Sequence, residues 1–288
     1  MKTFLFEQYG YYPSSFDNNE FELGGYKFKL LQTRFSEEDV LQMQYPIEVL
    51  KDSFYRWGPF IIKNKYDKYV STYENENYIL VAIYKINIGN NDIKKMHQTF
   101  YKNDEYIELN KTLEVWQKRV ENIEKNLSSY ISVEELCGKD IINEAMFYIG
   151  LSTNAMQYLS DVIGDLGEKL YGVTIAHKRF NNFESFDFLN PVNFVIDTPC
   201  RDLCFMIQNE LITMEELSKI LNEYNLDIKT ARVLMAKIMY RCDFFDCLEN
   251  KKVKSSNFNI EKEMNKIKKA YSLLKNKYQI RPIDWLES

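Results

Sequence analysis

The spacing of apolar residues changes once along this chain, near residues 88–91, and this change limits the possible folds more than any other feature. Before it, short runs alternate apolar and polar residues, as strands with one buried face do. After it, apolar residues recur every three or four positions, as on amphipathic helices. The sequence therefore predicts an α+β protein with a small sheet domain at residues 1–87, a linker at 88–94 and a helical domain at 95–288.

The first domain is predicted to be an antiparallel sheet with one helix. Residues 21–31 alternate apolar and polar on either side of Gly24-Gly25, which indicates a hairpin closed by a tight turn. Because no glycine-rich loop surrounds it, we interpret this glycine pair as a turn and not as a phosphate-binding loop. Further strands are expected at residues 60–62, 68–72 and 78–84.

The helix of this domain is predicted over residues 36–54. Ser36 and Asp39 have the spacing of a capping box at its start. Pro46 is expected to kink or split the helix, because proline removes a backbone donor and clashes with the preceding turn.

The second domain is predicted to be a bundle of four or more helices. The stripe over residues 109–127 steps by four and three positions, while residues 142–163 are apolar on more than one face, as in a helix surrounded by others. Capping boxes are expected at Ser132 with Glu135 and at Thr213 with Glu216. Further helical patterns cover residues 231–248 and 260–278.

Charge argues against a nucleic-acid partner. The chain has 37 basic and 42 acidic residues, a formal net charge of −5, so bulk charge does not favour a polyanion. The run Lys251-Lys252-Val253-Lys254 is a local exception, which we interpret as a solvated loop between helices.

Targeting and redox features predict a cytoplasmic protein. Residues 1–10 contain no apolar core of a signal peptide, and no stretch approaches the roughly 18 apolar residues that a membrane helix needs. We therefore expect no membrane span, and the five cysteines are expected to be reduced.

Two pairs of these cysteines have spacings that zinc sites also use, namely Cys200 with Cys204 and Cys242 with Cys247. A structural zinc ion is therefore one hypothesis. The other is that they are small apolar residues on helix faces, since Cys204 and Cys242 continue apolar patterns.

The least helical part of the second domain, residues 177–205, is where chemistry is expected. A short buried strand, Phe194-Val195-Ile196, is flanked by Asn193 and Asp197. Two oxygen-bearing side chains at the ends of one strand suit a magnesium ion shared with a phosphate. The alternative is that both residues only cap turns, which Asn and Asp commonly do. His97 and His177 have no partner at ligand or triad spacing, so structural roles are expected.

Four segments, together with the order of the predicted elements, resemble a known family. The segments are GPFIIKNKYDKYVSTYENENYILVAIY (58–84), YIGLSTNAMQYL (148–159), NPVNFVIDTPCRDL (190–203) and PIDWLE (282–287). The chain resembles the kinase-like fold of aminoglycoside and choline phosphotransferases, and more closely the kinase-like spore-coat-associated proteins of the CotS and YutH type. The resemblance implies a protein-kinase-like two-lobe fold, with a small antiparallel-sheet N-lobe and a mainly helical C-lobe.

The resemblance also implies a pattern of functional residues. Active members carry a catalytic loop written His-Gly-Asp-x4-Asn, then a metal-binding Asp. Here His177 is followed by Lys178-Arg179 in place of Gly-Asp, and Asn193 lies sixteen residues after His177. Phosphoryl transfer depends on positioning and charge neutralisation, so loss of the base together with a metal ligand should abolish useful rates.

We therefore expect a degenerate kinase-like protein, a pseudokinase, with a binding or scaffolding role, associated with the spore coat if the source forms spores. An unknown protein partner is favoured over a small-molecule substrate, and no cofactor is expected. The alternative is an ATP- and Mg-dependent small-molecule phosphotransferase with a rearranged loop. The residues that would serve it are Asp187 as base, Asn193 and Asp197 as metal ligands, Lys29 on phosphate and Glu48 as the partner of Lys29.

Overall fold

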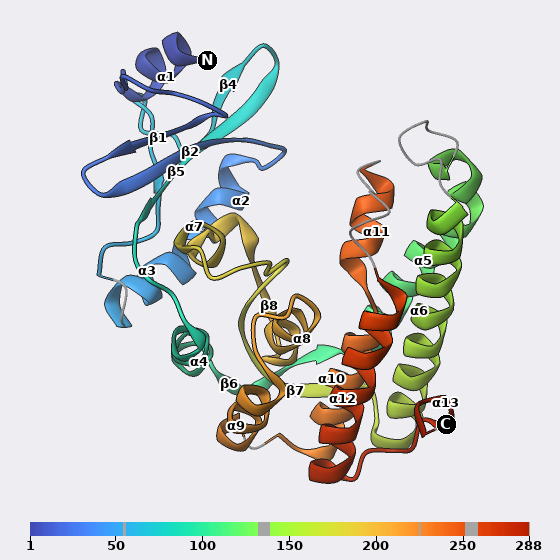
Figure 1. Cartoon of the computed structure of the whole chain (residues 1–288). Helices are drawn as coiled ribbons and strands as arrows, with labels where there is room; N and C mark the ends of the chain where they lie inside the picture. The colour runs from blue at the N-terminus through green and yellow to red at the C-terminus, as the bar shows by residue number, and fades with distance from the viewer. Residues whose placement is uncertain (54–55, 132–138, 225, 251–258, 288) are drawn as a thin grey trace. The chain divides into compact units, whose positions relative to one another are not determined.

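The structure is a computed structural model that describes residues 1–53, 56–131, 139–224, 226–250 and 259–287 (Figure 1). The chain divides into two compact units. The sheet unit contains Met1–Tyr101 and Thr174–Ile196, and the helical unit contains Lys102–Val173 and Asp197–Ser288.

This division differs from the predicted one in two ways. Helix α4 (Asn90–Thr99) occupies most of the predicted linker, and residues 174–196 return to the sheet unit. A local sequence pattern cannot show that a later segment packs against an earlier one.

The sheet unit is built on a five-stranded antiparallel sheet in the order β1-β2-β5-β3, with β4 also paired to β5. The hairpin of β1 (Glu20–Leu23) and β2 (Tyr26–Thr33) confirms the prediction. Its two-residue turn has positive φ at both positions, 58° at Gly24 and 83° at Gly25, which a type I′ turn requires. The other strands are β3 (Phe60–Ile62), β4 (Ser71–Tyr73) and β5 (Glu76–Tyr84), close to the predicted ranges.

The two faces of this sheet carry different side chains. One face packs against helix α1 (Lys2–Tyr9), which the sequence analysis did not predict. Its buried cluster contains Phe4, Leu5, Tyr9, Phe21, Phe28, Leu30, Tyr78, Leu80 and Ala82. Because side chains alternate along a strand, Lys27 and Lys29 of β2 lie on the opposite face, in register with Ile83 and Val81 of β5.

The helix predicted at residues 36–54 is divided into two helices, as expected from Pro46. Ser36 and Asp39 form the predicted capping box, with Asp39 N–H donating to Ser36 Oγ at 3.2 Å and Ser36 N–H donating to Asp39 at 2.8 Å. The structure has two helices, α2 (Glu37–Gln42) and α3 (Gln44–Ser53). Pro46 lies in the first turn of α3, where a missing N–H breaks no intrahelical bond. Residue 54, the predicted end, lies outside the described residues.

A second sheet has three strands in the order β6-β7-β8. Its strands are β6 (Lys102–Glu108), β7 (Lys169–His177) and β8 (Phe194–Asp197). Only β8 was predicted. Strand β6 is largely exposed and therefore shows no apolar alternation that a sequence could reveal.

The helical unit confirms the predicted helical patterns with one change. Helix α10 is central, since it packs against α6, α8 and α12, and all its residues from Ala231 to Met239 are buried. The predicted helix over 231–248 is interrupted at Tyr240 and Arg241, which separate α10 from α11. The helices are α5 (Leu109–Ile131), α6 (Lys139–Leu166), α8 (Cys200–Gln208), α9 (Met214–Tyr224), α10 (Ile228–Met239), α11 (Cys242–Glu249), α12 (Ile260–Tyr278) and α13 (Asp284–Glu287).

The predicted cap of Thr213 with Glu216 is present at α9, with reciprocal bonds of 2.8 and 3.1 Å. The predicted box of Ser132 with Glu135 and the basic run at residues 251–254 lie outside the described residues. Among the helices of the described ranges, none has the length and apolar character needed to cross a membrane.

Candidate functional site

A buried histidine with a structural role ends strand β7, immediately before the loop that leads to β8. His177 is the last residue of β7 and is fully buried. Its Nε2 lies 2.8 Å from the carbonyl oxygen of Phe188, and its ring stacks on Phe180 at 5.0 Å between centroids. His177 is thus a hydrogen-bonded core residue, as the sequence analysis expected. His97 is also buried, and its carbonyl accepts a bond from Thr174.

Asn193 closes the base of this segment. Its Oδ1 accepts from the backbone N–H of Arg179 at 3.0 Å, and its Nδ2 donates to the carbonyl of the same residue. The backbone N–H of Lys178 donates to the Asn193 carbonyl at 2.7 Å. Both ends of the amide are therefore used in joining the two ends of the loop, which is the turn-capping role considered for this residue.

Asp187 lies within the loop, on the short helix α7 (Ser185–Leu189). Its Oδ2 accepts from Asn182 Nδ2 at 2.7 Å, and Asn182 Oδ1 in turn accepts from the backbone N–H of Glu184 at 2.8 Å. This carboxylate therefore stabilises the turn that leads into α7.

Asp197 is the most strongly engaged carboxylate of the candidate site. It is buried, and both of its oxygens lie 3.0 Å from Lys237 Nζ. Arg201 Nη1 donates to Oδ2 at 3.0 Å, and the backbone N–H of Thr198 donates to Oδ1 at 2.7 Å. Burial by itself would raise the pKa of Asp197, but the charges of Lys237 and Arg201 outweigh it and hold the pKa below its ordinary value.

Lys29 has a carboxylate partner other than the predicted one. Its Nζ lies 2.5 Å from Glu20 Oε1, and Lys27 Nζ lies 2.8 Å from the other oxygen of Glu20. The ring of Phe186 lies 5.4 Å from the Lys29 ammonium. Glu48, the predicted partner, is an exposed residue of α3.

The structure thus brings the side chains of Asp187, Asn193, Asp197 and Lys29 each to a partner within its own unit, and several of these partners were not predicted. Lys237 had a detectable signal, because it is the one charged residue within the otherwise apolar stretch 233–239 of α10. Glu20 also had a signal, because a two-residue turn at Gly24-Gly25 places it directly opposite Lys29 on the neighbouring strand. Phe186 had none, since an aromatic residue in a loop is common.

Cys200 and Cys204 are buried as small apolar side chains. Burial raises the pKa of the Cys200 thiol to about 12 and the pKa of Cys204 well above its ordinary value. In the absence of a metal both are therefore protonated thiols. Within the described ranges no group of three or more His, Cys, Asp or Glu is placed to hold a metal, so the zinc hypothesis gains no support from them.

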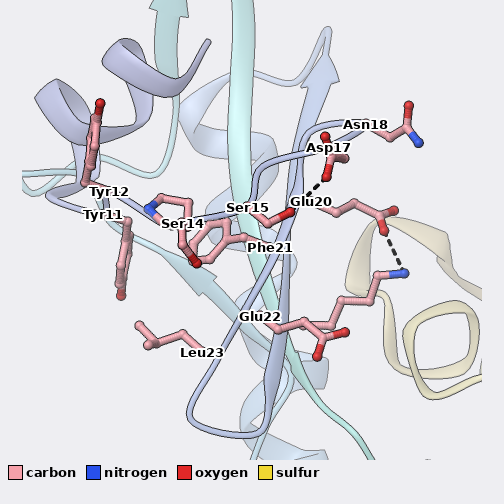
Figure 2. Close-up of a pocket in the computed structure, with 12 residues that line it drawn as sticks. Tyr11, Tyr12, Ser14, Ser15, Asp17, Asn18, Glu20, Phe21, Glu22 and Leu23 are labelled. Atoms are coloured by element: carbon pink, nitrogen blue, oxygen red, sulfur yellow. Dashed lines mark hydrogen bonds and ion pairs between the residues drawn. The ribbon is translucent and has the colours of Figure 1, made fainter.

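A groove of about 740 Å³ lies beside the edge strand β1 (Figure 2). Tyr11 and Tyr12 line one part of it, and Glu22 of β1 lines another. Asp17, also in the lining, accepts from Ser15 Oγ at 2.8 Å. The volume is within the range of about 300 to 1,000 Å³ of small-molecule sites, and the groove offers rings, hydroxyls and carboxylates for binding.

The chain has the fold of kinase-like phosphotransferases, and this fold defines its structural class. Spectinomycin phosphotransferase APH(9)-Ia, solved with ADP and spectinomycin, is similar over 94% of this chain and 92% of its own, with 13% identity and a TM-score of 0.54. An aminoglycoside phosphotransferase from Alicyclobacillus acidocaldarius has 7% identity over 90% and 89% of the two chains, with a TM-score of 0.47. The amicoumacin kinase hAmiN has 14% identity over 91% and 85%, with a TM-score of 0.45.

Within this class, the chain belongs to the family described as spore coat putative kinase YutH, whose model matches residues 2–280. The match covers nearly the whole chain and agrees with the resemblance found in the sequence. A search of curated proteins gives no match.

Proposed function

We propose that this protein is a degenerate member of the kinase-like fold that acts as a binding or scaffolding protein of the spore coat and does not transfer phosphate. The observation that carries the proposal is the state of Asp197, the carboxylate that would hold magnesium in an active relative. Its two oxygens are already bound by two cationic side chains of the chain itself, Lys237 and Arg201.

A magnesium ion at this carboxylate would meet two positive charges at about 3 Å from the oxygens that it needs. Mg²⁺ requires oxygen ligands at about 2.0–2.1 Å in octahedral geometry and gives up its water reluctantly. Binding it would therefore require Lys237 to leave a buried ion pair, which is strongly unfavourable for a buried charge. The pair supports a structural role for Asp197.

The other groups that a phosphotransferase needs are either replaced or hydrogen-bonded within the loop itself. The positions where the family pattern has Gly-Asp carry Lys178 and Arg179, and Asp187 accepts a bond inside its own loop. Asn193 uses both ends of its amide on Arg179. Without a free base and a free metal ligand, little rate enhancement can come from positioning and charge neutralisation.

The spore coat as the location rests on the family to which the chain belongs. A protein partner is favoured because the net charge of −5 does not suit a polyanion, and because the residues expected to hold nucleotide are already engaged.

The test is nucleotide binding by the purified protein. Thermal unfolding is followed with and without millimolar ATP and MgCl₂, and binding of a fluorescent ATP analogue is titrated in parallel. A ligand present at a hundred times its Kd would add about 2.7 kcal/mol to the free energy of unfolding, a shift of a few degrees for a chain of this size. We expect no shift and no saturable binding.

A magnesium-dependent shift in the wild-type protein would overturn the proposal and favour the ATP-dependent phosphotransferase. The matched variant is Lys237→Met, which removes one cation from Asp197 and leaves Arg201 in place. If this substitution alone created magnesium-dependent ATP binding, the engagement of Asp197 would be confirmed as the reason why the wild type does not bind.

A further inference from the structure

Strand β1 is an edge strand of its sheet, so alternate residues along it direct their backbone groups outward. A bond of 2.8 Å from Leu30 N–H to the Asn19 carbonyl identifies the set of residues that faces β2. Glu20 belongs to the other set: its N–H donates to the Asp17 carbonyl at 2.9 Å, and Asp17 N–H donates to the Glu20 carbonyl at 3.2 Å. Glu22 lies two residues further on and therefore also directs its N–H and C=O away from β2.

These two backbone groups of Glu22 have no hydrogen-bond partner within the described residues. Continuing the register of the Asp17–Glu20 bridge would place Ser15 opposite Glu22, but Ser15 makes no backbone bond to β1. Residues of both segments line the groove of about 740 Å³ that Figure 2 shows. An edge strand with an open donor and acceptor beside a groove is the geometry to which an extended peptide adds as a further strand.

The side chains around Glu22 divide between the two faces of the strand. Phe21 and Leu23 lie on the face of the aromatic cluster, where the Tyr11 ring packs against Phe21 at 5.5 Å between centroids. Leu23 is 55% exposed and lines the groove together with Tyr11 and Tyr12, and the Glu22 carboxylate points away from these three side chains in Figure 2. Apolar side chains of an added strand would therefore contact Leu23 and the tyrosines, and the residue between them would lie beside Glu22.

Glu22 selects the charge of the residue opposite it. Its Oε1 lies 2.5 Å from Lys85 Nζ, and its Oε2 has no partner within the part of the chain that the structure describes. Both side chains of this pair are more than half exposed, so the pair is only weakly held. Opposite charges that face each other across two strands stabilise the pairing, and like charges destabilise it. A second copy of this chain, paired antiparallel through the same edge, would set Glu22 against Glu22 and is disfavoured.

We propose that the outer edge of β1 is a strand-addition site for an extended segment of a partner protein, with a basic residue opposite Glu22 and an apolar residue on either side of it. The inference rests on the proposed function, because it names the kind of partner that a binding protein of this fold would hold. Main-chain bonds to Glu22 supply affinity, and the basic residue with its apolar neighbours fixes the register.

The experiment compares Glu22→Pro with Glu22→Ala. Both variants lose the carboxylate, but only proline also removes the outward N–H, and neither change removes a bond between β1 and β2. The probe is the peptide fluorescein-Val-Lys-Val-Lys-Val-amide, titrated by fluorescence anisotropy. We expect Glu22→Pro to bind it at least about fivefold more weakly than Glu22→Ala, which corresponds to the loss of one hydrogen bond. Glu22→Ala should in turn bind more weakly than the wild type, because the charge pair is lost.

Two changes to the peptide keep the test valid if Glu22→Pro destabilises the hairpin. Methylating both lysine backbone nitrogens removes the donors that face β1 and leaves every side chain, so wild-type affinity should fall at least about fivefold. Replacing both lysines with glutamate should also weaken binding, because like charges then face each other. Hydrogen exchange gives a direct readout: the peptide should slow exchange of the Glu22 amide and leave that of the Phe21 amide, which faces β2, unchanged.

Equal binding by Glu22→Pro and Glu22→Ala would overturn the inference, and so would equal binding of the methylated and unmethylated peptides or no saturable binding by the wild type. Dimerisation of the wild type that Glu22→Pro abolishes, measured by sedimentation, would assign this edge to a second copy instead. Failure of the proposed function is distinguishable from these results, because it appears as magnesium-dependent ATP binding by the wild type without any peptide.

Discussion

The ion pair between Asp197 and Lys237 should be strongly coupled, and a double-mutant cycle measures this coupling. In Asp197→Ala, the Lys237 ammonium would remain buried, with 8% of the side chain exposed, and would have lost its carboxylate. Removing one partner of a buried pair costs about 3–5 kcal/mol. In Lys237→Met, Asp197 keeps Arg201 and the Thr198 N–H, so we expect a smaller loss of about 1–3 kcal/mol.

The double variant, Asp197→Ala with Lys237→Met, removes the buried charges together. The double variant should lose less free energy of unfolding than the two single variants lose together, by at least about 1.5 kcal/mol, because no uncompensated ammonium remains. The assay is urea unfolding at pH 7, followed by circular dichroism, with the free energy of unfolding taken from the helical transition. Simple addition of the two single losses would refute the ion-pair argument.

The same pair predicts a dependence on pH. The folded-state pKa of Asp197 lies below its ordinary value of 3.8, so between the two values the unfolded state binds more protons than the folded state. The stabilisation that ionised Asp197 gives the folded state is therefore fully present above the ordinary pKa. It is lost as the pH falls through the folded-state pKa of Asp197. The difference in stability between wild type and Asp197→Ala should narrow as the pH is lowered below 3.8, and a constant difference would contradict the assignment.

Three further predictions concern single positions. Ser36→Ala removes the cap of α2 and should cost about 1 kcal/mol in urea unfolding. Gly25→Ala places a Cβ 2.7 Å from a tyrosine ring at φ 83° and should cost at least about 1–2 kcal/mol, whereas Gly150→Ala, within α6 and with nothing inside 4 Å, should stabilise by about 0.5–1 kcal/mol. Cys200 is buried and has a pKa of about 12, so it should react with Ellman's reagent at pH 8 only when the protein unfolds. Half-buried Cys247 should react in the native protein. Early labelling of Cys200 would be inconsistent with its burial.

Elements with a strong local signal were predicted accurately. The stripes of α5 and α12 place apolar residues every three or four positions, and the caps at Ser36 and Thr213 need only side chains three residues away. The β1–β2 hairpin likewise follows from two glycines between alternating runs. Each of these signals is contained within a few neighbouring residues, so the sequence displays it directly.

Elements without such a signal were missed. Strand β6 is exposed along most of its length, so no alternation marks it, and it is a strand only because β7 pairs with it. Helix α1 has Phe6 exposed beside buried Phe4 and Leu5, so it shows no clean apolar stripe, and its place on the aromatic face of the sheet defines its role.

The sequence by itself determined the order of a strand-rich and a helical region, the caps, the main helices and the family resemblance, because these depend on spacing between near neighbours. Only the tertiary structure decided the other partners of the candidate residues: Lys237 for Asp197, the ring of Phe186 for Lys29, and Arg179 for Asn193. These partners meet because the chain folds back on itself, and burial then fixes which charge lies beside which. Periodicity carries no information about contacts between residues so far apart in the chain, and it is those contacts that engage the candidate residues.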